Sequence, residues 1–301
     1  GGAMPLDVVA AEAALGRLGE TMGLGAVETA WAIHQIVNEN MAGAVKIHVI
    51  EKAQDPRRYA LLAYGGGGPL HATGVARALA IKTVICPPAA GVASAVGLLV
   101  APNALELARS YPVLVDGLDW GEIAALYRAM ETQAHAALAE AGVSPEHVQF
   151  ERSVDGRFAG QLHEINIALP PGLLTDGDAG PLLDQFRERY AVLYGHLPRG
   201  IPIEFLSWRL TARGPRPPLR LPHAEPGGDD PTPALKGHRN VYWSDHAGFV
   251  STPVYDRYAL RPGMRVPGPA IVEERESTTV VGPTMHAELD AAMNLLVHLG
   301  E

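Results

Sequence analysis

Apolar residues recur at three- and four-residue intervals through the first part of the chain, a pattern typical of amphipathic helices. They predict one helix over residues 7–19 and a second over 26–45, whose later part carries the polar run Asn38-Glu39-Asn40. The residues at 46–51 include several β-branched side chains and predict a short strand. The first predicted elements are therefore two helices followed by a strand.

A strand, a glycine run and a helix come next. Residues 59–64 predict a buried strand, 65–68 are four consecutive glycines, and Pro69 begins a segment with apolar positions at helical spacing. A second strand is predicted over 82–87. This order predicts a β-loop-α-β unit with a right-handed parallel crossover.

Helices and strands alternate less regularly beyond residue 87. The predicted elements are a buried helix within 87–101, a strand or helix over 106–111, a helix over 119–142, two strands within 150–169, a helix over 181–194 and a strand over 203–213. Residues 213–236 are rich in proline, glycine and charge and predict a linker with little regular structure. Short strands separated by turns predict a β module over about 237–301.

A chain of 301 residues is long enough for two ordinary hydrophobic cores. We expect a first domain over 1–108, which carries the glycine run, and an α+β domain over 109–301, which includes the linker and the β module. The hydrophobic fraction of 47% indicates folded rather than disordered segments.

Charge and cysteine content narrow the possible environments. A formal net charge of -9 argues against nucleic acid or an anionic membrane as a partner. The single cysteine, Cys86, lies in an apolar strand with no histidine in an activating pattern, so we expect a buried side chain, not a nucleophile. One cysteine suits a reducing cytoplasm, and there is neither a long apolar run nor a basic leader segment. His34 has no second ligand one helical turn later, and no metal site is predicted.

The glycine run carries the clearest candidate chemistry. Gly65, Gly66, Gly67 and Gly68 have no β-carbon, so the backbone can adopt positive φ and approach a ligand closely. The N–H groups of the following helical turn would face an anion, and Pro69 fits that turn because its missing N–H costs nothing there. No Lys-Ser or Lys-Thr pair follows, so the motif is neither a P-loop nor a dinucleotide fingerprint. It predicts a holder for phosphate or ribose; the alternative is a tight turn that packs the helix on the sheet.

Two asparagines late in the second helix need an explanation, because asparagine is a poor helix former. Asn38 and Asn40 either mark a fraying helix end or donate hydrogen bonds to a ligand held by the glycine loop. Both interpretations stay open from the sequence.

Several motifs, taken in order, resemble those of one family. They are Asn38-Glu-Asn-Met41, Asp55-Pro56, Tyr64-Gly-Gly-Gly-Gly-Pro-Leu-His-Ala72, Pro87-Pro88 with Gly91-Val-Ala-Ser-Ala-Val-Gly-Leu-Leu99, Asp155-Gly-Arg-Phe-Ala-Gly-Gln161, Tyr194-Gly-His196, Thr252-Pro-Val-Tyr-Asp-Arg257 and Gly268-Pro-Ala-Ile-Val-Glu-Glu-Arg-Glu-Ser-Thr-Thr279. Over nearly the whole chain they are similar to the hydantoinase A / 5-oxoprolinase family, which includes β-type subunits of acetone and acetophenone carboxylases.

The resemblance implies a fold. It is an α/β fold of the actin-like, ribonuclease-H-like (hexokinase-type) ATPases, of which this chain would supply the second lobe, followed by an α+β domain rich in β-strands. In such a fold the glycines after a second-lobe strand meet the adenosine and α-phosphate side of the nucleotide. The Asp-Gly-Gly-Thr motif of the first lobe is absent, so the chain resembles the C-terminal part of a longer subunit.

The resemblance also implies an activity. A family member is expected to use ATP and Mg²⁺ to activate a cyclic amide or ketone carbonyl by phosphoryl transfer, for ring-opening hydrolysis or carboxylation. Gly65 to Gly68, Pro69, Asn38 and Asn40 would then bind nucleotide, and His71 is the candidate catalytic residue, with a packing role as its alternative. A hydantoinase B type subunit is the expected partner in an oligomer. These residues alone are expected neither to hydrolyse ATP nor to bind it tightly.

Two other functions remain possible at this point. The chain could be a non-catalytic, partner-binding region of a carboxylase subunit, or a sugar-kinase-like ATPase, although the block at 268–274 fits sugar kinases poorly. Hydantoin, 5-oxoproline, acetone and other carbonyl compounds all remain candidate substrates.

Overall fold

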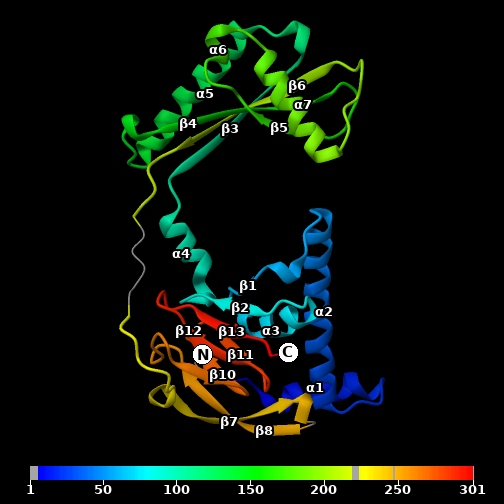
Figure 1. Ribbon diagram of the computed structural model, residues 1–301, viewed down its shortest axis with the longest axis vertical. Helices are drawn as coiled ribbons and strands as arrows, with labels where there is room; N and C mark the ends of the chain where they lie inside the picture. The colour runs from blue at the N-terminus through cyan, green and yellow to red at the C-terminus, as the bar shows by residue number, and fades with distance from the viewer. Residues whose placement is uncertain (1–5, 219–223, 247, 301) are drawn as a thin grey trace. The chain divides into compact units, whose positions relative to one another are not determined.

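The computed structural model describes residues 6–218, 224–246 and 248–300, which form two compact units (Figure 1). The first unit joins the residues up to 99 with those after 218, and the second spans 100–218. This division differs from the predicted one at residue 108, because strands near the C-terminal end pair with a strand of the N-terminal segment. In the described part of the chain, every helix is too short or too polar to cross a membrane.

The first unit begins with two helices, α1 (Val8–Glu20) and α2 (Ala26–Glu51). The Asp7 carboxylate caps α1 by accepting a hydrogen bond from the N–H of Ala10 at 2.9 Å. The predicted strand over 46–51 is wrong, because α2 continues to Glu51. Its Ile47 and Ile50 are 63% and 69% exposed, and a helix satisfies its own backbone groups where no strand offers pairing.

The predicted β-loop-α-β unit is confirmed. It consists of β1 (Leu61–Leu62), α3 (Gly68–Ala78) and β2 (Thr83–Cys86), and the two strands pair in parallel, with Leu61 opposite Val84. β1 is shorter and less buried than predicted: it forms the edge of its sheet, and Leu62 is 55% exposed.

Two sheets complete the first unit. One has the order β1-β2-β13-β12-β9, and the other has the order β11-β10-β8-β7. Their remaining strands are β7 (Leu235–Trp243), β8 (Gly248–Asp256), β9 (Arg265–Pro267), β10 (Ala270–Glu273), β11 (Thr278–Val281), β12 (His286–Leu289) and β13 (Leu295–His298). The segment predicted as a β module therefore contributes to both sheets, and α3 packs against β2 of one sheet and β11 of the other. One hydrophobic core joins these elements.

The helix predicted to be buried within 87–101 is α4 (Ala93–Val100), and none of its residues is buried. Leu98 and Leu99 are 79% and 76% exposed. An apolar sequence favours burial only where another part of the chain offers a surface to pack against. The described residues offer no such surface to α4. Short 3-10 turns lie at Pro56–Arg58, Ala90–Val92, Val115–Gly117, Pro145–His147, Thr232–Ala234 and Ser244–His246.

The second unit is a four-stranded antiparallel sheet with helices packed on it. Its elements are β3 (Ala104–Leu114), α5 (Trp120–Glu140), β4 (Gln149–Phe158), β5 (Ile165–Ala168), α6 (Leu173–Asp176), α7 (Gly180–Tyr194) and β6 (Ile203–Arg213), with strand order β3-β6-β4-β5. The segment at 106–111 is therefore a strand. α5 packs against β3 and β6, and α7 packs against β5, around a core that contains the fully buried Trp208.

The predicted linker over 213–236 is largely irregular where it is described, and its residues 219–223 lie outside the described residues. β7 begins at Leu235, two residues before the predicted start of the β module at about 237. The described elements thus place the glycine run in the first unit, between β1 and α3.

Candidate functional site

The glycine run forms a tight loop between β1 and α3. Gly65 has φ +88°, and its N–H donates to the carbonyl of Ala90 at 2.7 Å, while the N–H of Gly68 donates to the carbonyl of Gly65 at 3.2 Å. Among the described residues, the N–H groups of Gly66 and Gly67 have no hydrogen-bond acceptor. A β-carbon built on Gly65 or Gly67 would meet no atom within 4 Å. The loop therefore presents two free donors beside open space, just before the first turn of α3.

The turn between β10 and β11 packs against this loop. A β-carbon on Gly91 would stand 2.6 Å from the carbonyl oxygen of Glu276, and one on Gly66 would stand 3.4 Å from the same atom. These two glycines let the loop and the 3-10 turn at 90–92 approach the main chain of Glu276 closely. The position of the loop therefore depends on the position of that turn.

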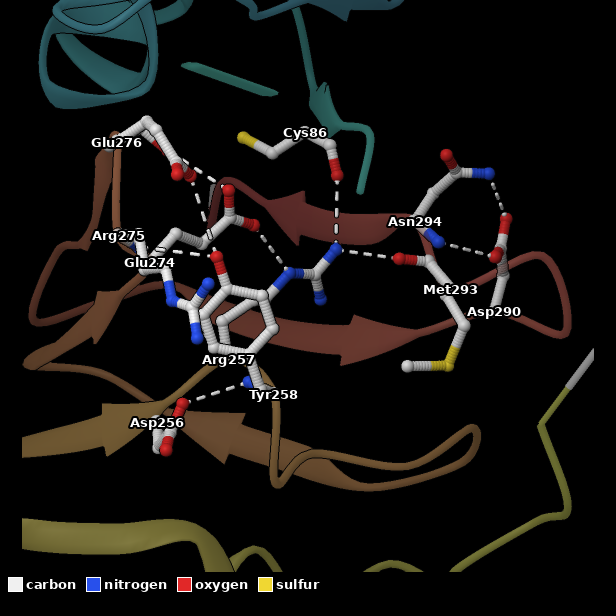
Figure 2. A network of polar contacts seen from close by, with 11 residues as sticks. Cys86, Asp256, Arg257, Tyr258, Glu274, Arg275, Glu276, Asp290, Met293 and Asn294 are labelled. Atoms are coloured by element: carbon white, nitrogen blue, oxygen red, sulfur yellow. Dashed lines mark hydrogen bonds and ion pairs between the residues drawn. The ribbon is translucent and has the colours of Figure 1, made fainter. Parts of the chain in front are cut away.

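Arg257 fixes the β10–β11 turn from inside the core (Figure 2). Its guanidinium, 5% exposed, donates to the Glu274 carboxylate at 2.9 Å and to the carbonyl oxygens of Cys86 and Met293 at 3.3 and 2.6 Å. Ser277 donates its hydroxyl to the same carboxylate at 3.1 Å. One cation thus joins the end of β2, the β10–β11 turn and the β12–β13 turn. Burial lowers the pKa of Arg257, and the charge of Glu274 opposes that change.

Sequence reasoning did not select Arg257 or Glu274 as site residues. Both lie inside motifs that carry the family resemblance, at 252–257 and 268–279, which is the signal that could have identified them. Their partnership depends on tertiary packing between residues seventeen positions apart.

Exposed polar and aromatic side chains near the same turn form a patch (Figure 2). The Tyr258 hydroxyl accepts a hydrogen bond from the N–H of Arg275 at 3.2 Å and lies 3.5 Å from the Glu276 carboxylate. The Arg275 guanidinium lies 5.9 Å from the centre of the Tyr258 ring, within cation–π range. Tyr258 is 53% exposed, so this patch can be reached from solvent.

His71 and Asn38 contact each other through their side chains, and within the described residues neither side chain hydrogen-bonds to the glycine loop. Nδ1 of His71 lies 2.9 Å from Oδ1 of Asn38, a geometry in which the ring donates its Nδ1 proton. Asn38 is 7% exposed, and a β-carbon on Gly74 would overlap its amide, so α2 and α3 pack closely here. Because α2 runs through this position to Glu51, helix fraying does not explain Asn38.

A stack of rings continues from His71 along α2. The His34 ring lies 4.9 Å from that of His71 and 5.5 Å from that of Trp31, in stacked orientations. Partial burial, and secondarily the neighbouring His71, lower the pKa of His34. Asn40 lies on the exposed side of α2 and, among the described residues, makes no recorded side-chain contact with this group.

Cys86 has the surroundings expected of a buried side chain. It is 1% exposed, and burial raises its pKa to about 11. Within residues 6–218, 224–246 and 248–300, no group of three or more His, Cys, Asp or Glu side chains is placed to hold a metal ion.

Two family models match the chain. The model described as hydantoinase/oxoprolinase matches residues 1–106, and the hydantoinase/oxoprolinase C-terminal domain matches residues 119–301. Together they cover most of both compact units.

Named relatives agree with these models. The acetophenone carboxylase gamma subunit of Aromatoleum aromaticum is 29% identical over 96% of this chain and 41% of its own length. The caprolactamase subunit alpha of Pseudomonas jessenii is 25% identical over 96% and 42%, and the acetone carboxylase beta subunit of Xanthobacter autotrophicus is 27% identical over 100% and 43%. The chain therefore spans about two fifths of the length of these relatives.

Solved structures share the fold. A nucleotide-free acetone carboxylase superposes with a TM-score of 0.80 at 22% identity, over 99% of this chain and 44% of the other. The ATP-dependent caprolactamase from Pseudomonas jessenii superposes with a TM-score of 0.74 at 22% identity, over 100% and 44%. These likenesses confirm the predicted mixed α/β fold.

Proposed function

Because this chain belongs to the hydantoinase/oxoprolinase family, we propose that it supplies one half of the nucleotide site of an ATP-dependent subunit that activates a carbonyl group. Relatives are named caprolactamase, 5-oxoprolinase and acetone carboxylase, and two solved relatives are described as ATP-dependent. The named substrates are cyclic amides and a ketone, which share a carbonyl carbon of low reactivity. We propose a substrate of this class, with ring-opening hydrolysis as the reaction for a cyclic amide.

The observation that carries this proposal is the glycine loop. Gly66 and Gly67 present free N–H groups beside open space at the start of α3, an arrangement that suits an anionic phosphate or a ribose. Gly65 sets the turn, and Gly68 with Pro69 begins the helix whose first turn faces the ligand. The loop would hold and orient the nucleotide, which is the main contribution a protein makes to phosphoryl transfer.

The remaining predicted site residues have different proposed roles. Asn38 holds the His71 ring through Nδ1, which would leave Nε2 for a polar contact with phosphate or substrate. In this arrangement Asn38 acts through His71 rather than on the nucleotide itself. Within the part of the chain that the structure describes, the Asn40 side chain makes no contact that supports a role, and its nucleotide binding stays a prediction.

Bound ATP would supply a phosphoryl group that makes the carbonyl carbon more reactive. Since the described residues contain no cluster of metal ligands, we propose that Mg²⁺ is held by the phosphates and by side chains beyond these residues. We further propose a cytoplasmic hetero-oligomer with a hydantoinase B type partner, supported by relatives that are named as subunits.

Calorimetric titration of Mg-ATP into the complete subunit that contains this chain tests the proposal. The decisive variant is Gly67→Asp, because a side chain there meets no protein atom and places a negative charge among the donors. The matched control is Gly43→Asp on α2, where a side chain also has open space. We expect affinity to fall about tenfold or more for Gly67→Asp and to stay unchanged for the control. Equal affinity of both variants and the parent would overturn the proposal.

The chain on its own should hydrolyse no ATP, since it carries no Asp-Gly-Gly-Thr motif. Phosphate release above background by the purified 301-residue chain would contradict this expectation.

A non-catalytic, partner-binding role is the second candidate. Exposed apolar side chains on α2 and α4, including Ile47, Ile50, Leu98 and Leu99, favour it. The same titration separates the two functions, because Gly67→Asp has no effect on nucleotide affinity if the loop only packs. The family match leaves the sugar-kinase alternative without support.

A further inference from the structure

The first unit contains a cavity whose lining does not include the glycine loop. It has a volume of about 440 Å³, within the range of small-molecule sites. Its walls come from α1, α2 and α3 on one side and from the β7–β8 hairpin and the segment after β11 on the other. Apolar residues in its lining include Leu15, Ala30, Trp31, Tyr242, Phe249 and Met285.

Aromatic rings form much of this lining. The Trp31 and Tyr242 rings lie 6.0 Å apart at 56°, and the Tyr242 and Phe249 rings lie 5.8 Å apart at 70°. Trp243 also lines the cavity, and its Nε1 donates to the Thr252 hydroxyl at 2.9 Å, so its polar atom is already satisfied. The Phe249 side chain is 62% exposed. A ligand in the cavity would cover part of this apolar surface, which is favourable.

The polar groups of the cavity fall into two sets. Charged side chains that line it, Glu12, Arg77 and Asp245, are exposed and therefore solvated. Its more buried polar members are His34, Asn38 and Thr73, of which only the imidazole can titrate. Burial and the adjacent His71 lower the pKa of His34, which keeps the ring neutral at pH 7.

We propose that this cavity binds a neutral small molecule built on one or two aromatic ring systems. Ring faces of Trp31, Tyr242 and Phe249 provide stacking and edge contacts, while none of the described lining residues places a buried charge there to compensate an ionised ligand. Gly65 to Gly68 are not among the residues that line the cavity, so this site is separate from the glycine loop. The inference does not depend on nucleotide binding there.

Two matched fluorescent probes test the proposal on the 301-residue chain. N-phenyl-1-naphthylamine is neutral, and 8-anilino-1-naphthalenesulfonate carries the same rings with an added sulfonate. We expect saturable binding of the neutral probe at one site. The sulfonate probe should bind with an affinity at least about tenfold lower. Equal or tighter binding of the sulfonate would overturn the assignment of a neutral ligand.

Two tryptophan variants locate the binding site. Ala30→Trp places an indole in the cavity wall and should weaken binding of the neutral probe about tenfold or more. Ala44→Trp adds the same side chain to an exposed position of α2 that does not line the cavity, and should leave the affinity unchanged. Identical affinity of both variants and the parent would place the probe elsewhere and refute the proposal.

A third variant covers the case in which Ala30→Trp disturbs folding. Because Phe249 is 62% exposed, Phe249→Ser removes a wall of the cavity with little effect on the core, which circular dichroism can verify. The neutral probe should bind it several-fold more weakly. A folded Phe249→Ser chain with parental affinity would count against the cavity.

Discussion

Gly91 lies so close to Glu276 that a β-carbon at position 91 would stand 2.6 Å from the Glu276 carbonyl oxygen. Real β-carbons do not approach backbone oxygens this closely, so any other residue at 91 must displace the β10–β11 turn. That turn also lies under Gly66. The contact therefore links a glycine outside the loop to the position of the loop itself.

We expect Gly91→Ala to lower the free energy of unfolding by about 1–3 kcal/mol, because the added methyl group forces backbone apart. Urea denaturation followed by circular dichroism measures this. Gly97→Ala is the control: Gly97 lies within α4, has open space, and should be neutral or slightly stabilising. Equal effects of the two substitutions would contradict the close-contact explanation.

The Arg257–Glu274 pair gives a second prediction. Replacing Arg257 with Met leaves the Glu274 carboxylate without its buried cation and should cost about 3–5 kcal/mol of stability. The double variant Arg257→Met/Glu274→Leu should recover part of that loss, because it removes both buried charges.

The exposed Asp55–Arg57 pair offers a control for this measurement. Arg57→Met should leave stability nearly unchanged, since its side chain is 69% exposed and solvated. If Arg257→Met were as mild as Arg57→Met in urea denaturation, the buried pair would not hold the turn in place.

Cys86 should resist alkylation in the folded chain. Burial raises its pKa from 9.0 to about 11, which lowers the thiolate fraction about a hundredfold at neutral pH, and its 1% exposure further limits access. Mass spectrometry after iodoacetamide treatment should show modification only once denaturant is added. Rapid labelling under native conditions would disprove this.

Glu273 makes stability depend on pH in a defined direction. Its carboxylate accepts hydrogen bonds from Lys236 at 2.7 Å and from Arg239 at 2.6 Å. These contacts, mainly the one with Lys236, hold the pKa of Glu273 below its usual value of 4.5. The unfolded chain therefore binds more protons as the pH falls, so this stabilisation is present above pH 4.5 and is lost as the pH falls through the lowered pKa.

Replacing Glu273 with Gln should cost about 0.5–1 kcal/mol at pH 7, because its cationic partners are half exposed. The difference from the parent should shrink in denaturation curves taken progressively below pH 4.5. Glu51→Gln, which alters an exposed carboxylate at the end of α2, should show little difference at either pH. A constant effect of Glu273→Gln across this range would rule out the ion pairs as its cause.

Sequence patterns correctly predicted the elements whose formation depends mainly on neighbouring residues in the chain. The β1-loop-α3-β2 unit, α5, α7 and the β4–β5 pair follow from apolar periodicity and glycine positions. The segment 46–51 was wrong because β-branched residues extend a helix when no strand is available for pairing. The strands at Arg265–Pro267 and His286–Leu289 are too short for periodicity to reveal, and their place in a sheet depends on distant partners.

The same limit applies to the candidate site. Four glycines after a strand were sufficient to predict the loop, because glycine has a distinct backbone freedom. The partners of His71 and Arg257 could not be predicted, since each contact joins elements that only tertiary packing brings together. The resemblance of the motifs to a known family identified the segments that contain His71 and Arg257, but it did not predict which residues these side chains contact.

The pairing of β2 with β13 has a consequence for how the chain folds during synthesis. Cys86 lies opposite Leu295, so the first sheet cannot close until a segment about two hundred residues further along has left the ribosome. The intervening unit, residues 100–218, is continuous and contains its own core, so it can fold while the first unit waits. During that interval the apolar faces of α3 and β2 stay uncovered, which makes the first unit the later and more aggregation-prone part of the nascent protein.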